Sequence, residues 1–161
     1  MWKIIQQLCE DIRGNLTVYE AVVLMMTALW SLRCHDKSRV IPVGYSMLLI
    51  LYITLLRRTP KYNEEIRYHI SFLPDVKVWT GNLLNVILYV PLGGTIYNMV
   101  ASIKGTAFAA LLSSVLCEMI QYFTHRGVAD INDVLFNVIG ACAGALLFRA
   151  FRAFKKKKDL Q

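Results

Sequence analysis

The sequence predicts an all-α protein, a polytopic transmembrane helical bundle with about five spans. Of its 161 residues, 56% are hydrophobic, whereas a typical soluble domain has about 45–50% apolar residues. The mean hydropathy is +0.44. Charged residues fall in short groups that separate apolar runs of about 17–19 residues, close to the roughly 20 residues that cross a hydrocarbon core. This pattern leaves no room for a separate soluble domain.

Five apolar runs follow one another along the chain. They are residues 16–32, 40–56, 83–101, 106–124 and 131–148. Runs of this length favour helices, because the strands of membrane barrels alternate in polarity over about 9–11 residues. Ahead of them, Trp2, Ile5 and Cys9 share one stripe of a helix whose other faces are polar. We therefore expect residues 1–15 to form an amphipathic segment in the membrane interface.

Lys and Arg counts give an orientation in a cell membrane. If the C-terminus is cytoplasmic, ten of the 18 Lys and Arg residues lie inside and eight lie outside. The dense tail Lys155–Lys158 decides this narrow difference, because cations next to a span favour the cytoplasmic side and attract anionic lipid. With five spans, the N-terminus is then expected outside.

The net charge of +7 is explained by this topology. No helix-turn-helix or aromatic–basic pattern accompanies it, so we expect no nucleic-acid partner. The four cysteines are Cys9, Cys34, Cys117 and Cys142, and no two form a CxxC pair. The three histidines are scattered without ligand spacing. We expect neither a metal site nor a cofactor.

Polar residues inside the apolar runs are the candidates for function, because ionisable groups at membrane depth are costly and face the bundle interior. Glu118 and Gln121 are three residues apart, with Ser114 one turn earlier. Six residues separate Glu118 from Thr124, which is roughly 9 Å along a helix. A carboxylate at that depth requires a partner or a proton.

The two neighbouring runs carry similar stripes. The residues concerned are Asp130, Asp133 and Asn137, continued by Gly140 and Gly144, and Asn82, Asn85 and Tyr89, continued by Gly93. Each set has helical spacing and so occupies one helix face. We expect the three stripes to face one another in a water-accessible pocket near the outer membrane surface.

Structural interpretations stand beside this one. Asn85 and Asn137 are also the residue type that joins membrane helices by hydrogen bonds. Asp130 fits a loop acid or a helix cap, and Asp133 fits a first-turn acid favoured by the helix dipole. Arg126 fits an anchor at a helix end. The pair Gly140 and Gly144 fits close helix packing better than chemistry.

The same residues carry a resemblance to a known family. The motifs are Asn85-x3-Tyr89-x-Pro91-Leu92-Gly93, Glu118-Met119-Ile120-Gln121, and Arg126-x3-Asp130-x2-Asp133-x3-Asn137-x2-Gly140-x3-Gly144. In them, the chain resembles the VanZ-like family over about residues 45–150. It departs from that family's four helices by one additional helix at 16–32. The chain then divides into the interfacial segment 1–15, the extra helix and loop 16–44, the VanZ-like core 45–150 and the basic tail 151–161.

The resemblance implies a function. VanZ-like proteins are bacterial membrane proteins, and the founding type is linked to resistance to teicoplanin-like lipoglycopeptides. Our first hypothesis is a non-enzymatic factor that binds or alters lipid-linked cell-wall precursors and so lowers antibiotic binding. The candidate functional residues are Asn85, Glu118, Gln121, Arg126, Asp130, Asp133 and Asn137, and the candidate packing residues are Pro91, Gly93, Gly140 and Gly144. The expected partners are membrane lipid and the precursor or the lipoglycopeptide, and a homo-oligomer is left open.

The second hypothesis is an intramembrane enzyme that acts on a lipid headgroup. It would use Glu118, Asp130 and Asp133 as acid, base or ligands of a divalent cation. No nucleophile elbow, HExxH motif or phosphate-binding glycine loop supports a specific reaction, so no catalytic residue is assigned. The loop at 57–80 combines cations with aromatic residues, which suits phosphate or sugar as well as a plain interfacial loop.

Overall fold

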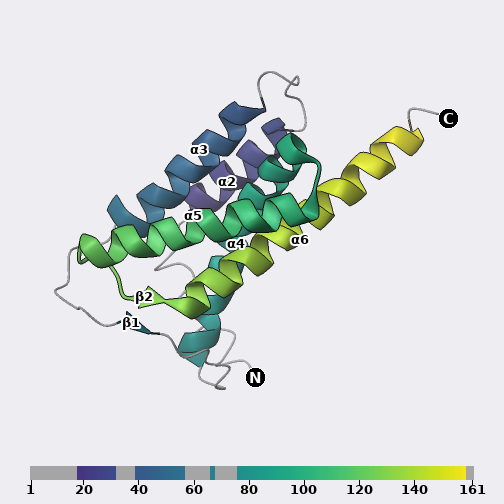
Figure 1. Cartoon of the computed structure of the whole chain (residues 1–161). Coiled ribbons are helices and arrows are strands. Elements are labelled where there is room, and N and C mark those ends of the chain that lie inside the picture. Colours follow the sequence, from purple (N-terminus) through teal and green to yellow (C-terminus); the bar gives the residue numbers. More distant parts are fainter. Residues whose placement is uncertain (1–17, 32–38, 57–65, 68–75, 159–161) are drawn as a thin grey trace.

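The computed structural model describes residues 18–31, 39–56, 66–67 and 76–158, and Figure 1 shows their arrangement. The elements are α2 (Val18–Ser31), α3 (Val40–Leu51), the π-helical segment η2 (Tyr52–Leu56), β1 (Ile66–Arg67), α4 (Val76–Val100), α5 (Ile103–Phe123), β2 (Ala129–Asp130) and α6 (Ile131–Lys158). The predicted interfacial helix at 1–15 lies outside the described residues. The all-α fold is confirmed.

Among the described residues, three helices are long and apolar enough to cross a membrane. These segments are Trp79–Val100, Ile103–Phe123 and Ile131–Lys155. The other two predicted spans are present as shorter apolar helices, α2 and the continuous α3–η2 segment. Large apolar side chains such as Phe108, Leu112 and Leu147 point outward, with more than half of their surface exposed. Such an apolar exterior is what a bilayer covers.

Two helix boundaries differ from the sequence-based expectation. Helix α4 begins at Val76 instead of 83, so the end of the predicted loop 57–80 is helical. The polar residues Thr80 and Asn82 ended the hydropathy signal, but both side chains are buried in the bundle. Helix α6 continues to Lys158, ten residues past 148, because Arg, Ala and Lys are good helix formers and cations stabilise a helix C-terminus.

Helix α4 lies at the centre of the bundle and contacts the four other α-helices of the described residues. Its most extensive contact is with α6, which crosses it and extends beyond the bundle toward the C-terminus (Figure 1). Tyr89 and Leu92 of α4 are almost fully buried, as are Leu24 of α2 and Ile50 of α3. The helices that flank α4 therefore share one apolar core.

Glycines allow α4 and α6 to approach closely. A Cβ on Gly93 of α4 would collide with the backbone of Ala141, and a Cβ on Gly144 of α6 would collide with the carbonyl of Val90. Gly140 meets the backbone of Val86 in the same way. Pro91 lies inside α4 and is buried, and the helix continues through it. The two backbones thus touch along about two turns, as in small-residue membrane contacts.

At the opposite end from β1 and β2, side chains satisfy the helix termini. Asn98 of α4 donates a hydrogen bond to the carbonyl of Ser31, at the end of α2. Arg39 Nη1 donates to the carbonyl of Asn98, at 3.2 Å. Terminal helix carbonyls lack partners within their own helix. These two bonds therefore join α2, α3 and α4 where the helices end.

Candidate functional site

The turn after α5 sets the geometry of the polar residues. His125 adopts a left-handed conformation with φ of 54°. Its N–H donates to the carbonyl of Tyr122 at 3.2 Å, and the N–H of Arg126 donates to the carbonyl of Gln121 at 3.0 Å. This pair of bonds is a Schellman motif, which ends a helix and reverses the chain. The reversal directs residues 126–130 back toward the start of α6.

Arg126 connects this turn to a distant helix. Its Nη1 donates a 3.0 Å hydrogen bond to the carbonyl of Leu55, within η2. A guanidinium has several donors and is always charged, so it suits the carbonyl end of a helix. The bond joins the turn after α5 to the end of η2.

A short parallel pair of strands brings the loop at 57–80 to the same end of the bundle. Ile66 pairs with Ala129, and Arg67 pairs with Asp130 (Figure 1). No strand was predicted there, since each strand has only two residues. The pairing places the middle of that loop beside Asp130.

Asp130 caps α6. Its Oδ1 accepts a 2.9 Å hydrogen bond from the N–H of Asn132, in the first turn of the helix. The N–H of Asp130 in turn donates to Glu118 Oε2 of α5, at 3.0 Å. Glu118 is 7% exposed, so its carboxylate lies inside the bundle at the positive end of the α6 dipole. Glu118 and Asp130 thus meet at the start of α6.

Asp133 lies one turn further along α6, at the third helical position. In a capping box, the acid at that position bonds the N–H of the capping residue. Here Glu118 takes that N–H from another helix. Asp133 Oδ1 instead accepts a 2.7 Å hydrogen bond from Asn85 Nδ2 of α4. The start of α6 is therefore hydrogen-bonded to α5 through the N–H of Asp130 and to α4 through the carboxylate of Asp133.

Asn137 extends this set one turn deeper. Its Nδ2 donates to Ser114 Oγ of α5 at 2.8 Å, and both side chains are buried. Asn137 Oδ1 and Gln121 Oε1 are also buried, and neither has a hydrogen-bond partner among the described residues. Gln121 lies against the turn, because a Cβ on Gly127 would meet its Oε1 at 2.6 Å. Two acceptors are thus available beside the carboxylates.

We call this set the polar cluster. It consists of Asn85, Ser114, Glu118, Gln121, Asp130, Asp133 and Asn137. Ser114 completes the pair with Asn137 and was visible in the sequence only as a stripe member. A further contact, Tyr89 Oη to Cys117 Sγ at 3.9 Å, lies on the same faces of α4 and α5. Cys117 carried no sequence signal, since a lone cysteine in an apolar run is ordinary core.

The chemistry available to the polar cluster is that of hydrogen-bond acceptance. The two amide oxygens without a partner among the described residues, Gln121 Oε1 and Asn137 Oδ1, suit a ligand with N–H or O–H donors. Among the described residues, no three His, Cys, Asp or Glu side chains are grouped to hold a metal ion.

Comparison with known families identifies the family of this chain. Residues 17–152 match the family model described as VanZ/LLP1. The chain belongs to this family. The match covers most of the chain, from the start of α2 to residue 152 within α6. No curated protein and no solved structure matches the chain. The VanZ-like resemblance seen in the motifs is confirmed, and the chain is a VanZ-like membrane protein.

Proposed function

We propose that this VanZ-like membrane protein lowers the susceptibility of a bacterium to teicoplanin-type lipoglycopeptides, by binding or altering a lipid-linked cell-wall precursor. In the proposed orientation, the C-terminus is cytoplasmic and the N-terminus is outside. The start of α6 and the loop at 57–80 then lie at the outer surface, where such antibiotics act.

The β1–β2 pairing is the observation that supports this proposal most. It joins the middle of the loop at 57–80 to Asp130, a member of the polar cluster. In sequence, that loop contains Arg57, Arg58 and Lys61 together with Tyr62. Cations and aromatic side chains bind phosphate and sugar, while the polar cluster accepts hydrogen bonds from hydroxyl and amide groups. A precursor headgroup presents all of these groups.

The test is expression in a sensitive Gram-positive host. We expect the native protein to raise tolerance to teicoplanin more than tolerance to vancomycin. Glu118→Gln and Asp133→Asn keep side-chain shape and remove charge, and each should abolish the gain in tolerance. Glu20→Gln is the matched control, since Glu20 is a buried acid of α2 outside the polar cluster. It should keep the full effect.

Membrane levels of every variant are measured by immunoblot of the membrane fraction. Tolerance from the two cluster variants equal to that of the native protein would show that the cluster only joins helices. No change in tolerance from the native protein would overturn the resistance proposal. A change in precursor composition that a chelator removes, and that only the native acids produce, would favour the enzyme hypothesis instead.

A further inference from the structure

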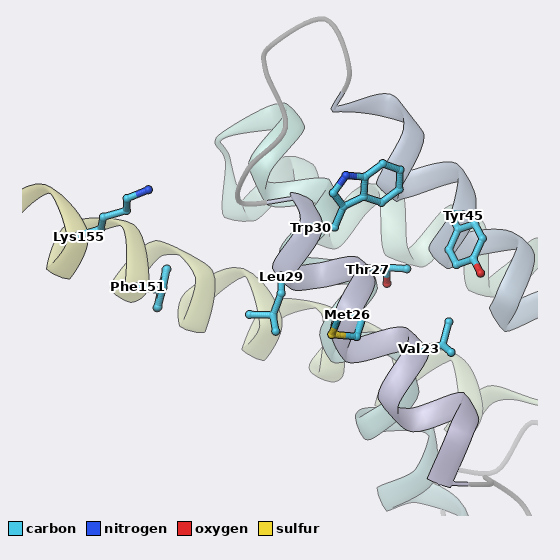
Figure 2. A pocket seen from close by; sticks show the side chains of 8 residues that line it. All are labelled: Val23, Met26, Thr27, Leu29, Trp30, Tyr45, Phe151 and Lys155. Atoms are coloured by element: carbon cyan, nitrogen blue, oxygen red, sulfur yellow. The ribbon is translucent and has the colours of Figure 1, made fainter.

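A groove lies near the C-terminal end of α6, away from the polar cluster. Its volume is about 730 Å³, within the range of pockets that hold a small molecule. Side chains from α2, α3 and α6 line it (Figure 2). Helices α2 and α6 both pack against α4, but α2 packs mainly on α3 and α4 and hardly touches α6. The groove is the space that this arrangement leaves.

The body of the groove is apolar. Val23, Met26 and Trp30 have a helical spacing of three and four residues on α2, and Phe151 also lines the groove, from α6 (Figure 2). Val23 and Trp30 are seven residues apart, so they span roughly 10 Å of the helix. Met26, Trp30 and Phe151 are each about half exposed. An apolar chain lying there would cover all three.

The polar group in the floor of the groove is already satisfied. Thr27 is buried, and its hydroxyl donates to the carbonyl of Leu24 at 2.7 Å. The same oxygen lies 3.2 Å from Ser46 Oγ of α3. Thr27 therefore offers no free donor to an occupant.

One end of the groove is cationic. Lys155 lines it and lies one turn beyond Phe151 on the same face of α6. In sequence, Lys155 begins a run of four lysines, and Arg152 precedes it. Trp30, next to the last residue of α2, also lines the groove, and tryptophan is typical of the membrane interface. The groove thus combines an apolar body with a cation at headgroup level.

We propose that this groove binds an anionic phospholipid of the surrounding bilayer, with an acyl chain along Val23, Met26 and Trp30 and the phosphate at Lys155. A second copy of the chain fits less well, because it would bring two lysine-rich helix ends together. This site is separate from the polar cluster and does not depend on the proposed resistance function.

The test uses Trp30 as a fluorescent probe in the full-length chain. Trp2→Phe and Trp79→Phe leave Trp30 as the single tryptophan. The protein is placed in phosphatidylcholine vesicles with equal mole fractions of brominated-chain phosphatidylglycerol or brominated-chain phosphatidylcholine. Bromine on an acyl chain in the groove quenches Trp30. We expect the anionic lipid to be enriched about fivefold beside Trp30, the ratio that the attraction of one near-surface lysine supplies.

Two matched variants separate the groove from general surface charge. Lys155→Gln should remove the preference for the anionic lipid. Lys104→Gln removes an exposed lysine that does not line the groove, and it should leave the preference unchanged. In a chain that keeps only Trp79, which lies at the far end of α4, Lys155→Gln should change nothing.

Equal quenching of Trp30 by the two lipids would overturn the proposal. An equal loss of the lipid preference in the two lysine variants would show that general surface charge attracts the lipid, and would overturn the proposal as well. No quenching by either lipid would show that protein covers the groove, and would overturn it in favour of a second copy or another segment of the chain.

Discussion

Asn85 Nδ2 of α4 donates a 2.7 Å hydrogen bond to Asp133 Oδ1 of α6, across 48 positions of sequence. Glu118 of α5 accepts the N–H of Asp130, the donor that a side chain at the third helical position accepts in a capping box. Asp133, at that position, bonds the neighbouring span instead. This one contact couples the start of α6 to the middle of α4.

We expect this bond to be measurable as an energetic coupling. Asn85→Ala and Asp133→Ala should each lower the free energy of unfolding. The loss in the double variant should be smaller than the sum of the two single losses by about 1 kcal/mol, the size of a hydrogen bond between membrane helices. The measurement is reversible unfolding in detergent micelles. Asn85→Ala combined with Glu20→Gln is the control pair and should be additive. Additive effects for the Asn85 and Asp133 pair would show that the bond contributes nothing to stability.

Gly144 should not tolerate a methyl group. Gly144→Ala places a Cβ against the carbonyl of Val90, and backbone atoms cannot rotate away as a side chain can. We expect a loss of about 2 kcal/mol or more in the free energy of unfolding, as for an overpacked core. Gly44→Ala is the control, because nothing lies within 4 Å of a Cβ there. It should be neutral or stabilising by up to about 1 kcal/mol, since Gly disfavours a helix interior. Equal stability of the two variants would contradict the close α4–α6 contact.

Ala101 should accept glycine with a gain in stability. It links α4 to α5 with a φ of 53°, and its N–H donates to the carbonyl of Tyr97 at 2.8 Å. A left-handed conformation costs an L-residue roughly 1–2 kcal/mol, a cost that Gly does not bear. Gly loses more conformational entropy than Ala when the chain folds, which offsets part of this gain. Ala101→Gly should therefore stabilise the protein by about 0.5–1 kcal/mol. Ala150→Gly, at an exposed position inside α6, should destabilise by about 1 kcal/mol. A loss of stability from Ala101→Gly would contradict the left-handed turn.

The sequence predicted the helices better than it predicted their ends. Hydropathy located the run at 131–148, but it could not follow α6 to Lys158, because charged residues are as helical as apolar ones in water. Hydropathy also missed the start of α4, because the polar residues Thr80 and Asn82 are typical of loops, although both are buried here. Periodicity identifies a helix face and reports nothing about how far that face continues outside the bilayer.

The stripes indicated which residues point inward, but not which partner each would find. Asn85, Asp133 and Asn137 lie on faces that helical spacing alone could assign. The bond between Arg126 and the carbonyl of Leu55 could not be foreseen, because it joins a side chain to a backbone 71 positions away. The β1–β2 pair was equally hidden, since two residues are too few for an alternating pattern.

The proposed orientation makes a prediction about two cysteines. Cys9 precedes the first predicted span and Cys34 follows it, and both lie outside the described residues. Impermeant maleimide added to intact cells should label Cys9 and spare Cys34, because one span separates them and the N-terminus is proposed to lie outside. Cys117→Ala and Cys142→Ala remove the two free cysteines of α5 and α6 from the readout.

Two further variants make the labelling unambiguous. Cys9→Ala should then abolish labelling of intact cells, whereas Cys34→Ala should leave it unchanged. Permeabilised cells should label both residues in the chain that keeps both, which controls for a thiol that is merely unreactive. The opposite pattern, with Cys34 labelled in intact cells and Cys9 protected, would reverse the orientation. The polar cluster and the loop at 57–80 would then face the cytoplasm, away from the site of lipoglycopeptide action, and the groove at Lys155 would face the outer leaflet.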